Sequence, residues 1–431
     1  ELTAALRAGD GYMVHGLERD ADDVEAARDF LHSRGLYGAV TVDRWSGGDL
    51  PYVDNLVNLL VCEEAGAVSP AEIERVLSPR GCALVRRGGK WVKKTKKWPE
   101  NIDEWTHYLH DPTNNAVSKD EQAGPPSHMQ WRAEPLWDRY HHNLATISSV
   151  VTSEGRLFYI ADRAPGASMN IRADWRLIAR DAFNGKWLWE KRLPSWAWYR
   201  RHFRSGPPQL PRLLVATGGR VYAPLGLDKP VSCMKATTGE VLRTYRDSGG
   251  AEELIVSGET LLVVTGRPVV EQAVKHPLFK EKYAFPNRKS VVAFNVAEGD
   301  KLWEWDPQGG NLRPETLASD GARVFFRVGQ AVTCLNLESG EKLWSYGKPT
   351  ASKRRRLTYG THVLVVSEGV VLCKLRNRLV ALSADDGDKL WDCRAGAGFH
   401  APADVFVIDG LVYQGEHPRD SVAPPAFKDF N

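Results

Sequence analysis

Apolar and polar residues alternate in short runs through most of the chain, and one such pattern recurs. Each copy has an apolar–x–apolar run, a few polar residues, a glycine, a charged or polar residue, and then an apolar residue that is usually followed by tryptophan. The copies occupy residues 179–190, 233–245, 293–305, 334–346 and 381–393. Apolar and other residues that alternate one by one on either side of a glycine predict two short antiparallel strands joined by a tight turn.

The spacing of the copies predicts the architecture. The turn glycines are 54, 60, 41 and 47 residues apart, by subtraction of their positions: Gly185, Gly239, Gly299, Gly340 and Gly387. One four-stranded propeller blade takes about 40–50 residues, so each copy and the hairpin before it make one blade. A sixth glycine-led strand lies at 409–416 without a tryptophan turn after it. We therefore expect a mainly β chain with a β-propeller of about six blades and an incomplete ring, because the chain is a fragment or because a partner segment closes the ring.

The tryptophans after the turns indicate how the blades pack. They stand on the second strand of each hairpin, where a large ring can fill the wedge between neighbouring blades. These residues are Trp187 or Trp189, Trp303, Trp344 and Trp391, whereas the second copy has Leu242 and Tyr245 nearby instead.

The A-x-D/N-x-x-x-G-x-x-L-W core of these copies resembles the repeat of the quinoprotein-like propellers, over roughly residues 105–431. This family includes pyrroloquinoline-quinone (PQQ) dehydrogenases and outer-membrane assembly lipoproteins. The resemblance implies the fold, but one propeller fold serves many activities. From it we expect a binding or scaffolding module of a larger bacterial protein in the periplasm or cell envelope, with a protein or small-molecule ligand on a propeller face.

An enzyme is the alternative that the resemblance implies. Quinoprotein dehydrogenases of this fold use adjacent cysteines, a calcium ion and a catalytic aspartate, and their cofactor is PQQ. The six cysteines of this chain include no adjacent pair and no C-x-x-C motif, which argues against a zinc knuckle, a thioredoxin-type pair and c-type haem attachment. Most lie in apolar runs, where buried free thiols are expected.

Residues 1–88 have a different pattern. Apolar runs at 14–18, 39–43 and 55–61 predict three short strands, and residues 70–85 predict a helix, a turn and a fourth strand. The amphipathic stretch after the first strand predicts a helix with Asp20 as its N-cap and Gly35 as its stop. Strands that alternate with helices predict a parallel α/β sheet.

The order of these elements resembles part of a class I S-adenosylmethionine (SAM)-dependent methyltransferase, which is Rossmann-like. By this resemblance Glu18 matches the acid that holds the ribose hydroxyls, and Asp43 with Trp45 matches the stretch beside the adenine. The glycine-rich loop that approaches the cofactor would precede Glu1, and Asn58 stands where active members often carry an acid. We therefore expect a partial, structural α/β segment, with a SAM-dependent methyltransferase that lacks its cofactor loop as the alternative.

These patterns divide the chain into three parts. Residues 1–88 are the methyltransferase-like segment, residues 89–130 are a linker that leads into the propeller, and residues 131–431 are the propeller itself. Glycine, proline and charged residues dominate the linker. This order of parts resembles large bacterial fusion proteins of the planctomycete type.

Composition adds little to this assignment. The formal net charge of +3 predicts no large field of one sign. Basic runs at 93–97 and 353–356 are expected to be solvated loops, and without a recognised reading module we expect no nucleic-acid partner. No apolar run approaches the ~20 residues that span a bilayer, so we expect no membrane span.

Histidines form the remaining candidate site. His107 and His110 lie three residues apart, Asp111 follows them, and His141 and His142 are adjacent. Histidine and carboxylate are ordinary ligands of transition metals, so these four histidines are a candidate metal site. The alternative is that they are polar residues packed between the first blade and the linker.

Overall fold

The computed structural model describes the chain except at residues 65, 126–128, 137–145, 167–170, 195, 197–209, 227–228, 269–273, 276–281, 284–285, 308–309, 350–362, 396–404 and 416–431. The contacts within the chain define two units. One comprises residues 1–102, 121–133 and 180–189, and the other comprises residues 103–120, 134–179 and 190–431. Residues 103–120, which lie within the expected linker, thus belong to the propeller unit.

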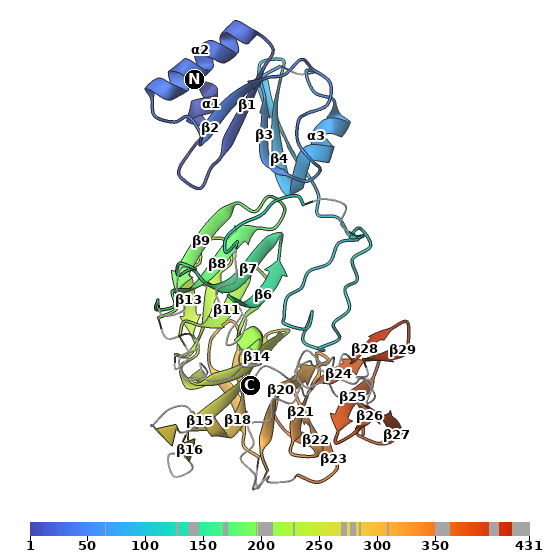
Figure 1. The fold of residues 1–431 in the computed structure, drawn as a ribbon. Coiled ribbons are helices and arrows are strands. Elements are labelled where there is room, and N and C mark those ends of the chain that lie inside the picture. The colour runs from blue at the N-terminus through green and yellow to red at the C-terminus, as the bar shows by residue number, and fades with distance from the viewer. Residues whose placement is uncertain are drawn as a thin grey trace, which may run out of the picture. The chain divides into compact units, whose positions relative to one another are not determined.

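The first unit contains the α/β elements. They are α1 (Leu2–Ala5), β1 (Val14–Glu18), α2 (Ala21–Ser33), β2 (Val40–Arg44), β3 (Val57–Cys62), α3 (Pro70–Val76), β4 (Leu77–Arg87) and β5 (Lys90–Thr95) (Figure 1). As predicted, Asp20 caps α2, because its carboxylate accepts the backbone N–H groups of Asp22 and Asp23.

Its strands pair in parallel as expected, β1 with β2 and β3 with β4. In the described residues they form two separate sheets rather than one, and β5 adds an antiparallel edge to β4. The basic run at 93–97 was expected to be a loop, and most of it instead lies on β5. Each sheet has its own small core, one around Val40 and Val42 and the other around Ile73 and Leu77.

In the part of the chain that the structure describes, the propeller strands fall into five four-stranded sheets and one two-stranded sheet. The sheets are β6 (Ile147–Ser153), β7 (Arg156–Asp162), β8 (Trp175–Asp181) and β9 (Trp187–Arg192); β10 (Val215–Thr217), β11 (Arg220–Pro224), β12 (Val231–Lys235) and β13 (Val241–Thr244); β14 (Ala251–Ser257), β15 (Thr260–Pro268), β18 (Pro286–Asn295) and β19 (Lys301–Trp305); β20 (Leu312–Ser319), β21 (Arg323–Val328), β22 (Ala331–Asn336) and β23 (Lys342–Tyr346); β24 (Leu364–Ser367), β25 (Val370–Leu375), β26 (Arg378–Ser383) and β27 (Lys389–Arg394); and β28 (Val405–Ile408) with β29 (Leu411–Gln414). A small hairpin, β16 (Val274–Lys275) and β17 (Lys282–Tyr283), lies between β15 and β18.

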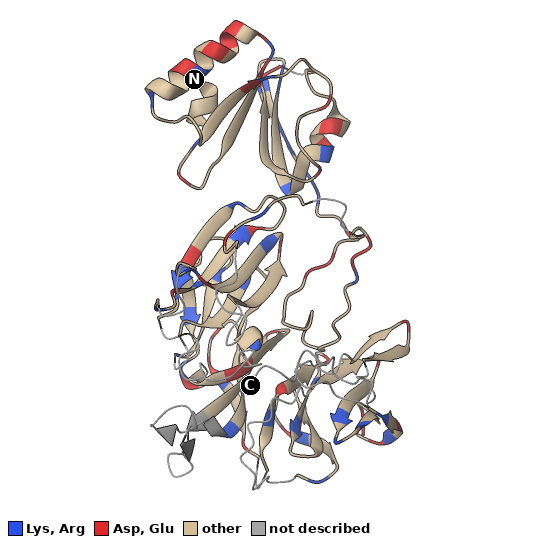
Figure 2. Ribbon diagram, in the orientation of Figure 1, with Lys and Arg blue, Asp and Glu red and all other residues tan. Residues whose placement is uncertain are grey.

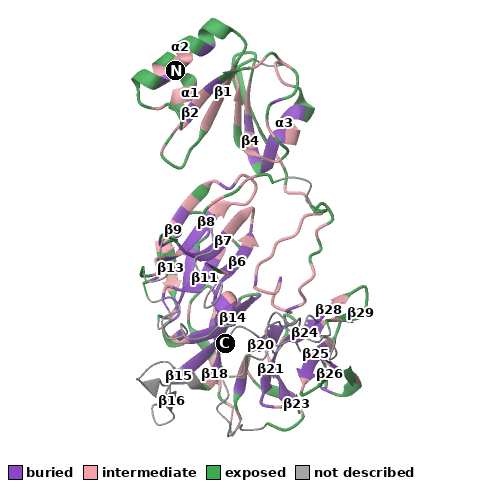
Figure 3. Cartoon of the chain, in the orientation of Figure 1, coloured by how far each residue is buried: buried purple, intermediate pink, exposed green. Residues whose placement is uncertain are grey.

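These sheets are blades around one axis. The first strand of each blade lies beside the first strand of the next, from β6 through β10, β14, β20 and β24 to β28. Apolar clusters fill the wedges between the third and fourth, fourth and fifth, and fifth and sixth blades. Burial accordingly concentrates on the first three strands of each four-stranded sheet, and the outermost strands are mostly exposed (Figure 3). The mainly β propeller predicted from the repeat is confirmed.

Trp303 and Trp344 pack between blades as predicted, whereas Trp187 and Trp391 are exposed. The Trp303 indole lies against Gly340 of the next blade and donates its Nε1–H to the Leu337 carbonyl at 2.9 Å. The Trp344 indole likewise lies against Gly387 and donates its Nε1–H to the Ala384 carbonyl at 3.0 Å. In each case the accepting carbonyl is three residues before the glycine.

The second blade uses another residue for this contact. Arg243 occupies the register position of the tryptophan, opposite Cys233. It lies against Gly299 and donates to the Val296 carbonyl at 3.0 Å. In the first unit, Trp131 covers Gly185 in the same way and donates to the Ala182 carbonyl.

Basic and acidic residues are interspersed in both units (Figure 2). Within the described residues no helix is long and apolar enough to cross a membrane. The basic run at 353–356 lies outside the described residues.

Candidate functional site

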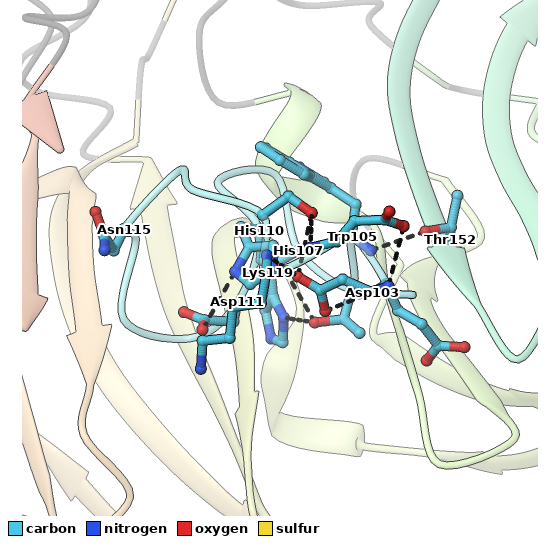
Figure 4. Close-up of polar contacts among 12 residues, drawn as sticks. Asp103, Trp105, His107, His110, Asp111, Asn115, Lys119 and Thr152 are labelled. Carbon is cyan, nitrogen blue, oxygen red and sulfur yellow. Dashed lines mark hydrogen bonds and ion pairs between the residues drawn. The ribbon is translucent and has the colours of Figure 1, made fainter. Parts of the chain in front are cut away.

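Residues 103–120 run along the inner strands of the propeller and bond to them in chain order. We call this stretch the hub segment (Figure 4). Its residues meet the six blades one after another, through the backbone or through a side chain. The contacts are Trp105 O to Thr152 N (2.7 Å) on β6, Thr106 O to Ala216 N (3.0 Å) on β10, His107 Nε2 to Val256 N (3.0 Å) on β14, Pro112 O to Ser319 N (2.8 Å) on β20, Thr113 O to Val366 N (2.9 Å) on β24, and Asn115 to Val407 on β28.

Two asparagines make the side-chain contacts at the far end of the hub segment. Asn114 is buried and donates to the carbonyls of Leu317 and Leu364, on two successive inner strands. Asn115 donates to the Val407 carbonyl at 3.0 Å and accepts the Val407 N–H at 2.9 Å. The hub segment therefore satisfies backbone groups that the inner strands leave unpaired on their channel side.

His107 is fully engaged within the hub. Val256 donates to Nε2, which fixes that nitrogen as an acceptor, so the ring proton is on Nδ1. Nδ1 lies 2.7 Å from the Thr106 hydroxyl, which in turn donates to the His110 carbonyl. Burial lowers the pKa of His107 to about 4, so the ring is neutral at neutral pH.

Asp103 closes the base of the hub segment. It accepts from His110 Nε2 at 2.7 Å and from the Lys119 backbone N–H at 2.7 Å, which joins the start of the segment to its end. A hydrogen bond to Asp111 raises the pKa of His110, against the opposing effect of burial, and Asp103 adds to the rise. Burial would raise the pKa of Asp103, but its hydrogen bonds to Lys119 and His110 bring that pKa below its ordinary value.

Two of the four candidate metal-binding histidines lie in the part of the chain that the structure describes. Both ring nitrogens of His107 and of His110 already have protein partners. His141 and His142 lie outside the described residues. Among the residues that the structure describes, no three His, Cys, Asp or Glu side chains are grouped so that they could hold a metal ion. A metal at His107 or His110 would first have to displace these hydrogen bonds.

A buried charge cluster lies beside the hub. We define it as Arg212, Glu252, Glu253, Lys289 and Glu315. Glu253 is fully buried, pairs with Arg212 at 2.7 Å, and accepts the backbone N–H groups of Glu315 and Leu317. The Arg212 guanidinium also lies over the ring of Tyr108 in the hub segment, 5.3 Å from its centroid.

Burial is the largest influence on the pKa values of Glu253 and Glu315 in this cluster. Burial raises the pKa of Glu253, although Arg212 and the two amide donors act against that rise. Burial also raises the pKa of Glu315 to about 8, and the nearby charges of Glu253 and Glu252 add to the rise. Glu315 is therefore mostly protonated at neutral pH, so the cluster can take up or release a proton near that pH.

Sequence reasoning missed this cluster and the bonding role of the hub. A signal was present, because two adjacent glutamates interrupt the otherwise apolar β14 strand. Acidic residues in a strand that is buried on both faces need partners, which places them against cations or backbone donors.

In the first unit, Glu18 and Asp43 lie near the carboxyl ends of the parallel strands β1 and β2. The Glu18 carboxylate accepts the backbone N–H groups of Arg19 and Asp20, and its carbonyl accepts the Trp45 N–H at 2.8 Å. Asp43 is held by Arg28 at 2.6 Å and by His15 at 3.0 Å, and the Arg28 bond lowers its pKa. The structure thus places Glu18, Asp43 and Trp45 at one strand edge.

All six cysteines are free thiols. Cys233, Cys334 and Cys373 are buried, as expected for thiols in apolar strands, whereas Cys393 is exposed. Burial raises the pKa of the Cys373 thiol to about 11, so this group is a poor nucleophile at neutral pH.

The blades, their order around one axis and the packing of Trp303 and Trp344 define a β-propeller. Residues 287–417 match the PQQ-like repeat family model described as outer membrane protein assembly factor BamB. No curated protein sequence matches the chain.

Solved structures of similar fold include PQQ-type propellers. The quinohemoprotein alcohol dehydrogenase from Comamonas testosteroni is 13% identical, with 68% of this chain and 49% of that chain covered and a TM-score of 0.43. A europium-containing methanol dehydrogenase is 10% identical, with 68% and 58% covered and a TM-score of 0.46. BamB from Moraxella catarrhalis is 14% identical, with 63% and 80% covered and a TM-score of 0.33. This chain spans about half the length of the two dehydrogenases.

Proposed function

We propose that the propeller is a binding or scaffolding module that holds a protein or small-molecule ligand on one of its faces. The observation that supports this best is the hub segment, which bonds to the inner strand of each of six blades. A frame held in this way presents its connecting loops at fixed positions, and preorganisation of this kind lowers the entropy cost of binding.

The match to the BamB model supports a protein partner and a site in the periplasm or cell envelope, because that family is described as an outer membrane protein assembly factor. Residues 1–88 are proposed to be a structural α/β segment, and residues 131–431, together with the hub segment, the binding module. If the α/β segment were instead active with SAM, a cytoplasmic site would follow.

Titration calorimetry on the full chain tests this proposal against the enzyme alternatives. We expect no heat with SAM and none with PQQ in the presence of calcium. We also expect a protein partner, once captured and purified, to rebind the purified chain with a Kd in the micromolar range or below. Tight binding of PQQ with calcium, or failure of every captured partner to rebind from pure components, would overturn the scaffold proposal.

The α/β segment supports one second candidate, a SAM-binding site. The supporting observation is that Glu18, Asp43 and Trp45 meet at the carboxyl edge of parallel strands, where such folds bind nucleotides. If this candidate is correct, SAM binds the wild-type chain and Glu18→Ala weakens it at least tenfold. Glu25→Ala, a change on the exposed face of α2, is the matched control and leaves the affinity unchanged.

A further inference from the structure

One carboxyl of the buried charge cluster has no bonded partner among the residues that the structure describes. The other two carboxylates form ion pairs, Glu253 with Arg212 at 2.7 Å and Glu252 with Lys289 at 2.7 Å. Glu315 supplies the third carboxyl, from β20 of the fourth blade, and no hydrogen bond or ion pair of the described chain reaches it. Buried carboxyls in proteins are ordinarily paired, so this one stands out.

A bulge in β20 holds Glu315 beside the two ion pairs. Four residues of β20, 314–317, lie opposite the single residue Phe326 of β21. Glu315 has a φ of +75°, which residues other than glycine rarely adopt. The Glu253 carboxylate accepts the backbone N–H groups of Glu315 and Leu317, at 2.7 and 3.2 Å. A strained backbone of this kind persists only where its surroundings hold it, so Glu253 fixes the position of the third carboxyl.

The charges around Glu315 leave room for one more cation. The groups that act on it are two carboxylates and three cations, which are Glu252 and Glu253 on β14, Arg212, Lys289 on β18, and Arg313 on its own strand. Arg212 and Lys289 are already engaged by the other two carboxylates, and Arg313 forms no ion pair with Glu315. Burial raises the pKa of Glu315 to about 8, so without a partner the carboxyl keeps its proton at neutral pH.

The position also selects the chemistry of that cation. Glu315 is 8% exposed, so only a narrow group reaches its carboxyl. A cation that carries N–H donors gains charge-assisted hydrogen bonds from a carboxylate as well as the attraction between opposite charges. Among the described residues no three acidic, histidine or cysteine side chains are grouped to hold a metal ion. A primary ammonium group at the end of a flexible chain meets these conditions.

We propose that Glu315 anchors a binding site for a primary ammonium group, carried by a small amine or by a lysine side chain. An N–H of the ammonium donates to the Glu315 carboxylate, and the proton of the carboxyl leaves to solvent as the cation binds. The two neighbouring ion pairs stay in place and keep the bulge in position. This inference rests on the proposed binding function and names the chemical group that a ligand carries.

Titration calorimetry of the full chain with n-butylammonium chloride tests the proposal. We expect a Kd in the millimolar range at pH 7 and the release of nearly one proton, read from the heats in two buffers of different ionisation enthalpy. Because a proton is released, binding should be about tenfold weaker at pH 6 than at pH 7. Tetramethylammonium chloride is the control salt, because it has the same charge and no N–H, and it should not bind.

Two variants assign the binding to the carboxyl. Glu315→Gln keeps the shape of the protonated side chain and is expected to weaken the binding of n-butylammonium at least tenfold, with no release of a proton. Glu341→Gln, at an exposed glutamate of the same blade, is the matched control and leaves the affinity unchanged.

The amide of Nα-acetyl-lysine distinguishes the two sources of the group. Binding at least as tight as that of n-butylammonium assigns the site to a lysine side chain of a protein, and weaker binding assigns it to a small amine. The proposal is overturned if neither amine binds, if Glu315→Gln binds n-butylammonium as the wild-type chain does, or if tetramethylammonium binds equally well. The scaffold proposal is tested with a captured protein and with cofactors, so its failure can be told apart from these results.

Discussion

Trp344→Ala and Trp391→Ala form a matched pair of perturbations. Both tryptophans stand at the same place in the repeat, and each pairs with a small residue on the neighbouring strand. They differ in cover, because Gly387 of the next blade lies on the Trp344 ring, whereas no turn glycine in the described part of the chain lies on Trp391. A difference in the loss of stability between the two variants therefore measures the inter-blade contact itself.

The expected difference follows from the burial and the hydrogen bond of each ring. Trp344 is 8% exposed and Trp391 is 39% exposed. The difference between these exposed fractions is nearly a third of the total surface of a tryptophan. For a side chain that buries up to about 250 Å², this fraction corresponds to about 2 kcal/mol of apolar burial. The hydrogen bond from Trp344 to Ala384 adds about 1 kcal/mol. We expect Trp344→Ala to destabilise the propeller by about 3–5 kcal/mol and Trp391→Ala by about 3 kcal/mol less.

Hydrogen exchange measured by mass spectrometry is the appropriate assay. The chain has two units and is not expected to unfold in one step, so a global midpoint would mix their contributions. Exchange of the β22–β26 amides reports the stability of the affected blades directly. Equal acceleration of exchange by the two substitutions would refute the reasoning, because it would mean that cover by the next blade contributes nothing measurable.

Three further predictions concern the buried polar groups. Because the folded-state pKa of Glu315 is raised to about 8, its contribution to stability is full below its ordinary pKa and is lost as pH rises towards 8. Glu315→Gln should therefore remove a decline on the order of 4 kcal/mol in the stability of the propeller between pH 5 and pH 8. Denaturant titrations in which the unfolding of the propeller is followed by proteolysis of its blades measure this, and an unchanged pH profile would contradict it. His107 behaves in the opposite way, because its folded-state pKa is lowered to about 4. Its contribution to stability is present above its ordinary pKa and is lost as pH falls. The same measurement on His107→Gln should therefore show about 3 kcal/mol less loss of stability between pH 6.5 and pH 4 than the wild-type chain. Asn115→Ala removes both hydrogen bonds to Val407, so amide exchange in β28 and β29 should accelerate while exchange in β6 and β7 stays at its wild-type rate; parallel acceleration in all four strands would show that the hub acts as one unit instead.

The blades and the α/β elements could be predicted from the sequence because their signals are local. A glycine with positive φ, a period-two apolar pattern and an N-cap aspartate each act within a few residues, as at Gly387 and Asp20. The packing of Trp303 and Trp344 was also predictable, since the repeat places each of these rings where a neighbouring blade can cover it. The use of Arg243 in place of a tryptophan was not, because an arginine after a turn is ordinary on a solvated strand.

The candidate sites were less accessible to sequence reasoning. The spacing of His107 and His110 indicated metal ligands, but spacing carries no information on which groups face the ring nitrogens. The structure gives those nitrogens a backbone amide, a hydroxyl and two carboxylates. The burial of Glu253 and Glu315 depends on strands that are neighbours only once the blades have closed on one another.

The hub segment shows why such contacts leave no pattern in the strands that receive them. Asn115 meets Val407 across 292 residues of sequence, and Asn114 meets Leu364 across 250. On the receiving side most of the bonded groups are backbone N–H and C=O, which almost every residue type provides, and the Thr152 hydroxyl, which accepts the Trp105 N–H, is an exception. The side-chain specificity of these contacts therefore lies mainly in the hub segment, in the two adjacent asparagines, the neutral histidine and the aspartate that closes its base. It follows that substitutions at His107, Asn114 or Asn115 should loosen the blades that each side chain contacts, whereas a substitution at Asp103 should open the base of the hub segment.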